Sequence, residues 1–203
     1  MCTIMTRCSR ISPKISKVRQ LHLTVTLQML EYHWDEETDA FCDVTLDTEE
    51  NELVPMRHQG YLSLFPFLFD LIAEHPEQVK AVLEMLQDPE RLWSEFGIRS
   101  LSKSDDFFGQ GENYWRGPIW INMNYLVLRA LNKYYIPRGD ANSALAKEIY
   151  TDLRSNVIEN IYREYQRTGT FWEQYHPTTG QGQRSHPFTG WTTLVLMMMS
   201  ETY

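Results

Sequence analysis

The chain has 203 residues, of which 42% are hydrophobic and 13% aromatic. Such a chain folds into a globular domain with a sizeable core, which excludes extensive disorder. Its formal net charge of −8 argues against general nucleic-acid binding, because a polyanion requires a basic surface.

The first 20 residues differ from the rest in charge. They carry no acidic residue, and their basic residues are Arg7, Arg10, Lys14, Lys17 and Arg19. The segment is basic and Ser-rich like a transit peptide, but it lacks the apolar core of a secretory signal. We therefore expect residues 1–21 to lie outside the fold, as a processing segment or as sequence foreign to it, and residues 22–203 to form the domain.

Helical periodicity dominates the remaining chain. Apolar residues recur at helical spacing over residues 23–34, 64–72, 76–86, 119–135 and 145–165, and a last helix is expected from Pro187 to the C-terminus. No stretch shows the sustained alternation of an exposed sheet. Residues 35–52 look like an acidic loop without calcium-loop spacing, hence a solvated acidic surface. The fold class predicted is all-α.

Neither a metal site nor a membrane segment is indicated. The three cysteines and the histidines are not spaced as metal ligands, so we predict no metal and no cofactor. The longest purely apolar run covers residues 194–199, far short of the roughly 18 residues that a bilayer requires. We expect no membrane contact from this chain as written.

Two loops concentrate aromatic and polar residues, and each runs into an apolar helix. The first carries Tyr114, Trp115, Arg116, Trp120, Asn122 and Asn124. Indole rings stack on the apolar face of a sugar, while Arg and Asn hydrogen-bond to its hydroxyls. The alternative is that both tryptophans belong to the core and that Arg116 forms an ion pair at a helix start.

The second loop holds a single acid, Glu173, between Trp172 and Gln174-Tyr175. A carboxylate among apolar rings can have its pKa retuned and can activate a water, as the general base of a glycoside hydrolase must. The alternative is a structural role, in which Glu173 forms an ion pair with Arg184 across the turn.

Several blocks of the sequence, taken together, resemble glycoside hydrolase family 63, in particular its mannosyl-oligosaccharide glucosidases (processing α-glucosidase I). The blocks, in the order of the family, are GYLSLFPFL at 60–68, LWSEFGIRSLS at 92–102, FFGQGENYWRGPIWINMNYL at 107–126, FWEQYHPTTGQG at 171–182 and PFTGWTTLVL at 187–196. The resemblance implies the C-terminal half of an (α/α)6 barrel of the six-hairpin glycosidase type. It also implies an inverting enzyme that removes the terminal α-1,2-linked glucose from the glucosylated N-linked oligosaccharide in the endoplasmic reticulum.

The resemblance also implies roles for individual residues. The acid of the WEQY-like block is the family's general base, which corresponds to Glu173. The WRG block shapes the glucose pocket. The expected substrate-binding residues are Tyr114, Trp115, Arg116, Gly117, Trp120, Trp172 and Tyr175.

One block of the family is not found. The general acid belongs to a Gly-Leu-Asp-Asp-Tyr-Pro-like block, and Asp105-Asp106 stands in a different context. We therefore expect a fragment of the enzyme that is inactive by itself. The alternatives are a carbohydrate-binding remnant that no longer hydrolyses glycans, and an incomplete version of a full enzyme.

Overall fold

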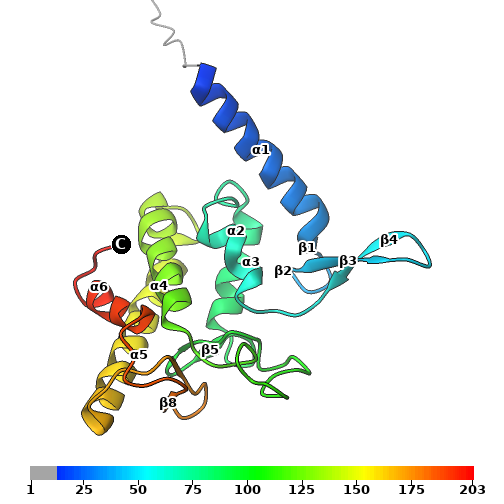
Figure 1. Ribbon diagram of the computed structural model, residues 1–203. Coiled ribbons are helices and arrows are strands. Elements are labelled where there is room, and N and C mark those ends of the chain that lie inside the picture. Colours follow the sequence, from blue (N-terminus) through cyan, green and yellow to red (C-terminus); the bar gives the residue numbers. More distant parts are fainter. Residues whose placement is uncertain (1–12) are drawn as a thin grey trace, which may run out of the picture.

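The structure is a computed structural model that describes residues 13–203, and it is built mainly from helices (Figure 1). The mainly helical class predicted from the periodicity is therefore confirmed. The helices are α1 (Pro13–His33), α2 (Phe65–Leu68), α3 (Pro76–Gln87), α4 (Ile121–Ala130), α5 (Ser143–Thr168) and α6 (Val195–Met199). Shorter 3-10 or π turns are η1 (Leu62–Leu64), η2 (Leu131–Tyr135), η3 (Ile136–Arg138) and η4 (Trp191–Leu194).

The core lies around α4, which packs against α2, α5 and α6, while α3 packs against α5. Val127 and Leu128 of α4 and Leu153 and Val157 of α5 have no exposed surface. Each helix turns its apolar stripe toward the others, so burial of these stripes is the main stabilising contribution. The cluster also fixes the ends of α4 and α5, next to which the site is built.

The predicted helices at 76–86 and 145–165 are confirmed as α3 and α5. Pro76 occupies the first turn of α3, where its missing N–H costs nothing. Gly169 follows α5 with φ of 76°, the left-handed conformation that commonly ends a helix. These local signals set the boundaries of the two helices.

Two other predicted helices are shorter than expected. The helix at 64–72 ends with α2, because Asp70 adopts a left-handed φ of 61°. The helix expected from Pro187 begins only at Trp191. The Phe188 N–H donates to the Phe171 carbonyl at 2.9 Å, which keeps this part of the chain outside any helix.

Short antiparallel hairpins are the main departure from the all-α prediction. They pair β1 (Trp34–Asp35) with β2 (Ala40–Phe41), β3 (Asp43–Asp47) with β4 (Glu52–Met56), β5 (Trp93–Ser94) with β6 (Gly97–Ile98), and β7 (Gln174–Tyr175) with β8 (Gly182–Gln183). The predicted acidic loop at 35–52 is therefore wrong. Asp47 Oδ1 accepts the Glu49 N–H at 2.8 Å and so shapes the turn between β3 and β4.

Helix α1 leads away from the helix cluster (Figure 1). The boundary expected between residues 21 and 22 falls inside this helix, and residues 1–12 of the expected foreign segment lie outside the described residues. Along α1, Leu21, Leu23 and Leu27 are more than half exposed, while the buried Thr26 hydroxyl donates to the Leu71 carbonyl at 3.1 Å. The helix is thus attached to the fold through its C-terminal half.

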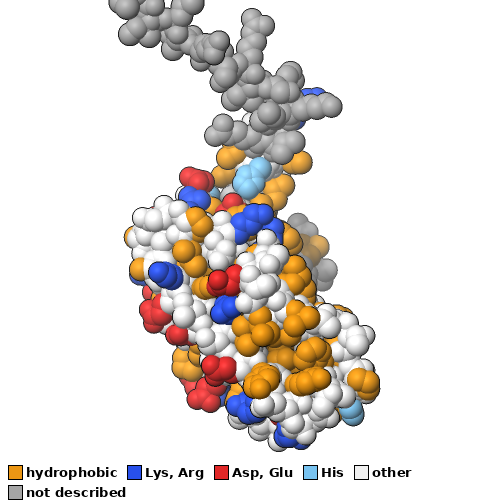
Figure 2. Space-filling view, turned by 90° about the vertical axis from the view of Figure 1, so that its left-hand side faces the viewer, with side chains coloured by type: hydrophobic (Ala, Val, Ile, Leu, Met, Phe, Trp, Pro, Cys, Tyr) orange, Lys and Arg blue, Asp and Glu red, His pale blue; other side chains and the backbone are white. Residues whose placement is uncertain are grey.

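A band of hydrophobic side chains covers part of the face seen in Figure 2, on the side where α6 lies in Figure 1. On α6 the large exposed apolar side chains are Leu196, Met197 and Met199.

No helix within residues 13–203 has both the length and the apolar character of a membrane-crossing segment.

Candidate functional site

Extended backbone brings the two aromatic loops together beside the start of α4. The Ile119 N–H donates to the Tyr175 carbonyl at 2.8 Å, and the Tyr175 N–H donates to the Ile119 carbonyl at 3.0 Å. Arg99 forms a second antiparallel bridge with Ile119. Three segments distant in sequence therefore lie side by side here, and the loops that extend from them form one surface.

Asn124 supports this junction from α4. It has no exposed surface, its Oδ1 accepts the Ile98 N–H at 2.7 Å, and its Nδ2 donates to the Trp120 carbonyl at 2.8 Å. A buried amide bonded to the backbone in this way is not available to a sugar. The expectation that Asn124 binds sugar hydroxyls is wrong.

Glu173 lies at the centre of the surface and is only 8% exposed. Its Oε1 accepts a hydrogen bond from the Tyr114 hydroxyl, and its Oε2 accepts the backbone N–H of Ser185 at 3.2 Å. The Glu173 carbonyl accepts the indole N–H of Trp191 at 2.7 Å. The carboxylate is therefore held at both oxygens, and its backbone is anchored separately.

These contacts keep Glu173 ionised. The hydrogen bond from Tyr114 lowers the pKa of Glu173, burial opposes it, and the Ser185 N–H and the charge of Arg184 add to the lowering. The same hydrogen bond raises the pKa of Tyr114, which therefore stays protonated as the donor. A buried carboxylate in its charged form can accept a proton from a water.

A stack of aromatic rings extends from Tyr114. Its ring meets Trp120 edge-on with centroids 4.7 Å apart, and Trp120 stacks on Trp115 at 3.8 Å with an interplanar angle of 9°. Trp120 is 1% exposed, as the core alternative proposed, whereas Trp115 is 50% exposed. One tryptophan thus supports the other, and only Trp115 offers a ring face to a ligand.

A cavity of about 570 Å³ borders Trp115. Its wall includes Phe41, Tyr61, Met123 and His58, so it is mostly apolar with a few polar groups. Concave, mainly apolar sites with a few polar groups are typical of ligand pockets.

Arg116 and Gly117 stabilise the conformation of the first loop. The Arg116 guanidinium lies over the Phe107 ring at 5.1 Å and donates to the Gln110 carbonyl at 3.2 Å, so it forms no ion pair in the part of the chain that the structure describes. Gly117 has φ of 126°, and a Cβ there would lie 2.7 Å from the Phe108 ring. Only glycine fits this position.

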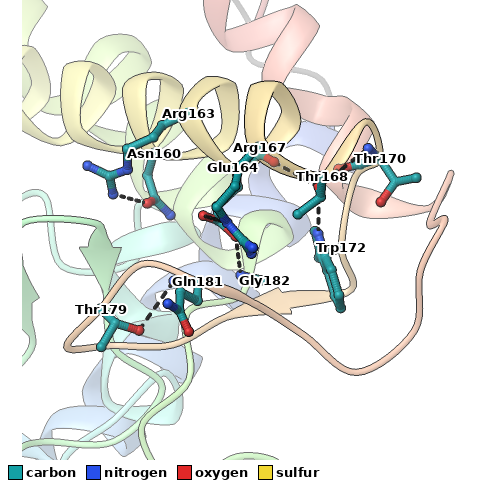
Figure 3. A network of polar contacts seen from close by, with 10 residues as sticks. All are labelled: Asn160, Arg163, Glu164, Arg167, Thr168, Thr170, Trp172, Thr179, Gln181 and Gly182. Atoms are coloured by element: carbon teal, nitrogen blue, oxygen red, sulfur yellow. Dashed lines mark hydrogen bonds and ion pairs between the residues drawn. The ribbon is translucent and has the colours of Figure 1, made fainter.

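Trp172 and Tyr175 lie on the side of the loop that faces α5 and the core. Trp172 donates its indole N–H to the Thr168 hydroxyl at 3.1 Å (Figure 3), and it stacks on His186 with centroids 3.8 Å apart. Tyr175 has no exposed surface. The structure therefore groups Glu173, Tyr114, Trp115 and Trp120 with one another and places Trp172 and Tyr175 behind them.

The alternative ion pair between Glu173 and Arg184 does not form. Arg184 pairs with Glu112 at 2.5 Å, and its guanidinium lies 5.4 Å from the centre of the Tyr114 ring. The positive charge is near enough to favour ionised Glu173 without occupying its oxygens.

Three contacts of the site were not predicted from the sequence. Trp191 belongs to a block that supports the family resemblance, which was a usable signal. Tyr61 accepts the Trp120 backbone N–H at 3.0 Å and donates to the Ile98 carbonyl at 2.8 Å from inside the core. Ser185 acts through its backbone N–H, which no side-chain motif reveals.

Among the described residues, no three His, Cys, Asp or Glu side chains come together as metal ligands.

Comparisons with known proteins agree on one family. The family described as "Glycosyl hydrolase family 63 C-terminal domain" matches residues 2–201. A Schizosaccharomyces pombe protein named "Probable mannosyl-oligosaccharide glucosidase" is 50% identical over 171 residues, which are 84% of this chain and 21% of that protein. The Saccharomyces cerevisiae protein named "Mannosyl-oligosaccharide glucosidase" is 37% identical over 197 residues, which are 92% of this chain and 23% of that protein.

A solved structure shares the fold. The crystal structure of GH63 mannosylglycerate hydrolase from Thermus thermophilus with Tris and D-glycerate matches with a TM-score of 0.66 at 22% identity. The match covers 91% of this chain and 39% of that one. The chain thus spans about a fifth of the length of the two yeast relatives.

Proposed function

Because the chain belongs to glycosyl hydrolase family 63, we propose that it is part of an inverting exo-α-glucosidase that removes the terminal α-1,2-linked glucose of the glucosylated N-linked oligosaccharide. The observation that carries this proposal is the Glu173 carboxylate, buried, ionised and held by donors from two loops beside a tryptophan stack. The substrate assignment follows the names of the two yeast relatives, and the proposed location is the endoplasmic reticulum.

The proposed chemistry gives Glu173 the role of general base. A water on the far side of the sugar ring from the leaving group donates a proton to Glu173 and attacks the anomeric carbon, while the glycosidic bond breaks and a general acid protonates the leaving oxygen. Tyr114 and Ser185 would keep the carboxylate aimed at this water, and the exposed face of Trp115 would stack on the sugar. Trp120 would act by supporting Trp115.

An inverting glycosidase also requires a general acid, with the two carboxyl groups about 6.5–9.5 Å apart. Asp105 accepts a hydrogen bond from His58 at 2.8 Å and takes no part in the contacts around Glu173. We propose that the acid comes from the part of the relatives' catalytic domain that this chain does not cover, and that the chain forms half of a six-hairpin barrel. The exposed apolar side chains of α6 support this arrangement, since a partner half would cover them.

The test uses a chimera in which this chain replaces the corresponding part of the Saccharomyces cerevisiae relative. We expect the chimera to release glucose from a glucosylated oligosaccharide, and the isolated chain to release none. A chimera that folds but releases no glucose, while the intact relative does so in the same assay, would contradict the proposal.

The exposed face of Trp115 favours one second candidate function, glycan binding without hydrolysis. Calorimetric titration of the isolated chain with the same oligosaccharide tests this candidate. Binding by the isolated chain together with an inactive chimera would favour it over hydrolysis.

A further inference from the structure

Glu164 is a buried acid that the proposed reaction does not use. It is 3% exposed and lies near the C-terminal end of α5, where the helix dipole disfavours negative charge. Burial of a carboxylate is also unfavourable unless it is well paired. A neutral residue at this position would avoid both unfavourable contributions to the free energy. The groups that bind Glu164 therefore indicate what an acid contributes here.

Those partners come from two separate elements (Figure 3). Arg167 donates from Nε to Oε1 at 2.9 Å and from Nη2 to Oε2 at 2.8 Å. Gly182 donates its backbone N–H to Oε2 at 2.9 Å. The pair with Arg167 stays within one helix, whereas the contact with Gly182 joins α5 to the β7–β8 hairpin. Hydrogen bonding by Arg167 lowers the pKa of Glu164, burial opposes it, and the Gly182 N–H adds to the lowering.

The contacts close into a ring through Trp172. A Cβ on Gly182 would collide with Cγ of Trp172, so the indole packs directly on the Gly182 backbone. The Trp172 N–H donates to the Thr168 hydroxyl at 3.1 Å, and this hydroxyl can donate to the Glu164 carbonyl at 2.8 Å. The ring therefore runs from Glu164 to Gly182, Trp172 and Thr168, and back to Glu164.

Glu173 lies between two chain segments that this ring holds. Trp172 precedes it and belongs to the ring, and Gln174–Tyr175 follows it and pairs with Gly182–Gln183. Among the described residues, the carboxylate itself accepts hydrogen bonds from the Tyr114 hydroxyl and from the Ser185 N–H. A base must be held to within about 0.5 Å of its productive position, and supporting contacts behind it provide such precision.

We propose that Glu164 is a positioning residue: through the Gly182 amide and the Trp172 indole it fixes the loop that carries Glu173. This proposal rests on the proposed function only in calling Glu173 the general base. It predicts that Glu164 controls the local order of the loop around Glu173, which a residue that merely strengthened α5 would not do.

The chain offers a matched control for a purely structural ion pair. Asp35 is 9% exposed and is likewise bound by two nitrogens of one arginine, with Arg57 Nε at 3.0 Å from Oδ2 and Nη2 at 3.2 Å from Oδ1. It lies in β1, outside the ring around Trp172. Asp35→Asn should therefore lower stability without affecting the Glu173 loop.

The experiment compares Glu164→Leu, Glu164→Gln and Asp35→Asn in the 203-residue chain. Amide hydrogen exchange is measured across residues 170–185, and the ionisation of Glu173 is followed by NMR of carboxyl-labelled glutamate. We expect Glu164→Leu to speed exchange at Glu173, Tyr175 and Gly182 by about tenfold or more, because the loop opens locally. We also expect it to raise the pKa of Glu173. Glu164→Gln keeps an oxygen for the Gly182 N–H, so its effect should be smaller but in the same direction.

Unchanged loop exchange and unchanged Glu173 ionisation in a folded Glu164→Leu variant would overturn the proposal. If Glu164→Leu does not fold, Glu164→Gln decides: faster loop exchange supports the proposal, and exchange equal to that of Asp35→Asn overturns it. Neither readout requires catalysis. An inactive chimera would therefore contradict the proposed function without affecting this inference. Unchanged hydrogen exchange in the loop would contradict this inference without affecting the proposed function.

Discussion

The hairpin beside Glu173 and the hairpin formed by β3 and β4 are both short antiparallel pairs, yet they are attached to the fold in opposite ways. In β7, Gln174 and Tyr175 have no exposed surface, and the surrounding loop is bonded to α5 and to the buried Ile119. Every residue of β4 is exposed, and its strand partner is β3. Backbone pairing alone therefore does not determine how rigid a hairpin is; attachment to buried elements does.

The largest effect that this contrast between the two hairpins predicts is on the rate of catalysis. In the chimera, Glu173→Gln keeps the size of the side chain but removes its basic lone pair, so kcat should fall by about 10² or more while the oligosaccharide still binds. Glu52→Gln, an exposed acid in β4, is the matched control and should leave kcat unchanged. Steady-state kinetics together with binding of unreacted glycan measure both variants. A lowered melting temperature with nearly intact kcat in Glu173→Gln would contradict the assignment of the base.

The next effect concerns stability. Gly182→Ala forces a methyl group against Trp172, a ring that stacking on His186 and the bond to Thr168 hold in place. We expect the free energy of unfolding to fall by about 3 kcal/mol, at the upper end for overpacking. Urea unfolding measures it.

Gly139→Ala is the control for this substitution. A Cβ there meets nothing within 4 Å, so only the left-handed φ of 66° is strained, at about 1 kcal/mol. Leu53→Ala, on the exposed β4, should change the free energy of unfolding by less than about 0.5 kcal/mol. Equal losses in all three variants would remove the contrast between the two hairpins.

The same contrast explains what could be predicted from the sequence. Helices α3 and α5 follow from apolar spacing and from local signals such as Pro76 and Gly169. The β3–β4 hairpin was missed because it is acidic and largely exposed: in β3 the half-buried Val44 and Asp47 are separated by exposed Thr45 and Leu46, so burial does not alternate along the strand. Local patterns suffice where local interactions decide the structure.

The candidate site was predictable only in part. Glu173 among aromatic residues was an informative motif, and the Tyr114 hydroxyl does bind its carboxylate, while Trp120 packs on Tyr114. Burial of Tyr175 and the role of the Ser185 N–H follow instead from the bridge to Ile119 and from the path of the loop, which are tertiary features. No local pattern encodes a backbone donor supplied 12 residues away.

A smaller effect is expected for the exposed tryptophan. In the chimera, Trp115→Ala removes the ring face that would stack on the sugar, which should weaken binding about fivefold, corresponding to about 1 kcal/mol. Because the contact exists before the transition state as well, KM should rise more than kcat falls. Tyr162→Ala, which removes an aromatic ring that is 60% exposed on α5, should leave KM unchanged. Equal KM values for the two variants would contradict a sugar contact at Trp115.

The smallest effect tests whether the attachment of the Glu173 loop is partly electrostatic. The pKa of Glu173 is lowered in the folded chain, chiefly by the Tyr114 hydroxyl, so ionised Glu173 contributes stability above its ordinary pKa near 4.5. This contribution is lost as the pH falls from that value through the lowered pKa of the folded state. Tyr114→Phe removes the donor and raises the pKa of Glu173, so the variant should lose less stability than the parent chain between neutral pH and acid. Urea unfolding at a series of pH values measures the difference. The Tyr125 hydroxyl donates to the Thr202 carbonyl at 3.3 Å rather than to Glu173. Tyr125→Phe removes this hydroxyl and should keep the pH dependence of stability of the parent chain. If Tyr114→Phe keeps it as well, Tyr114 holds the loop by packing against Trp120 and not through the charge of Glu173.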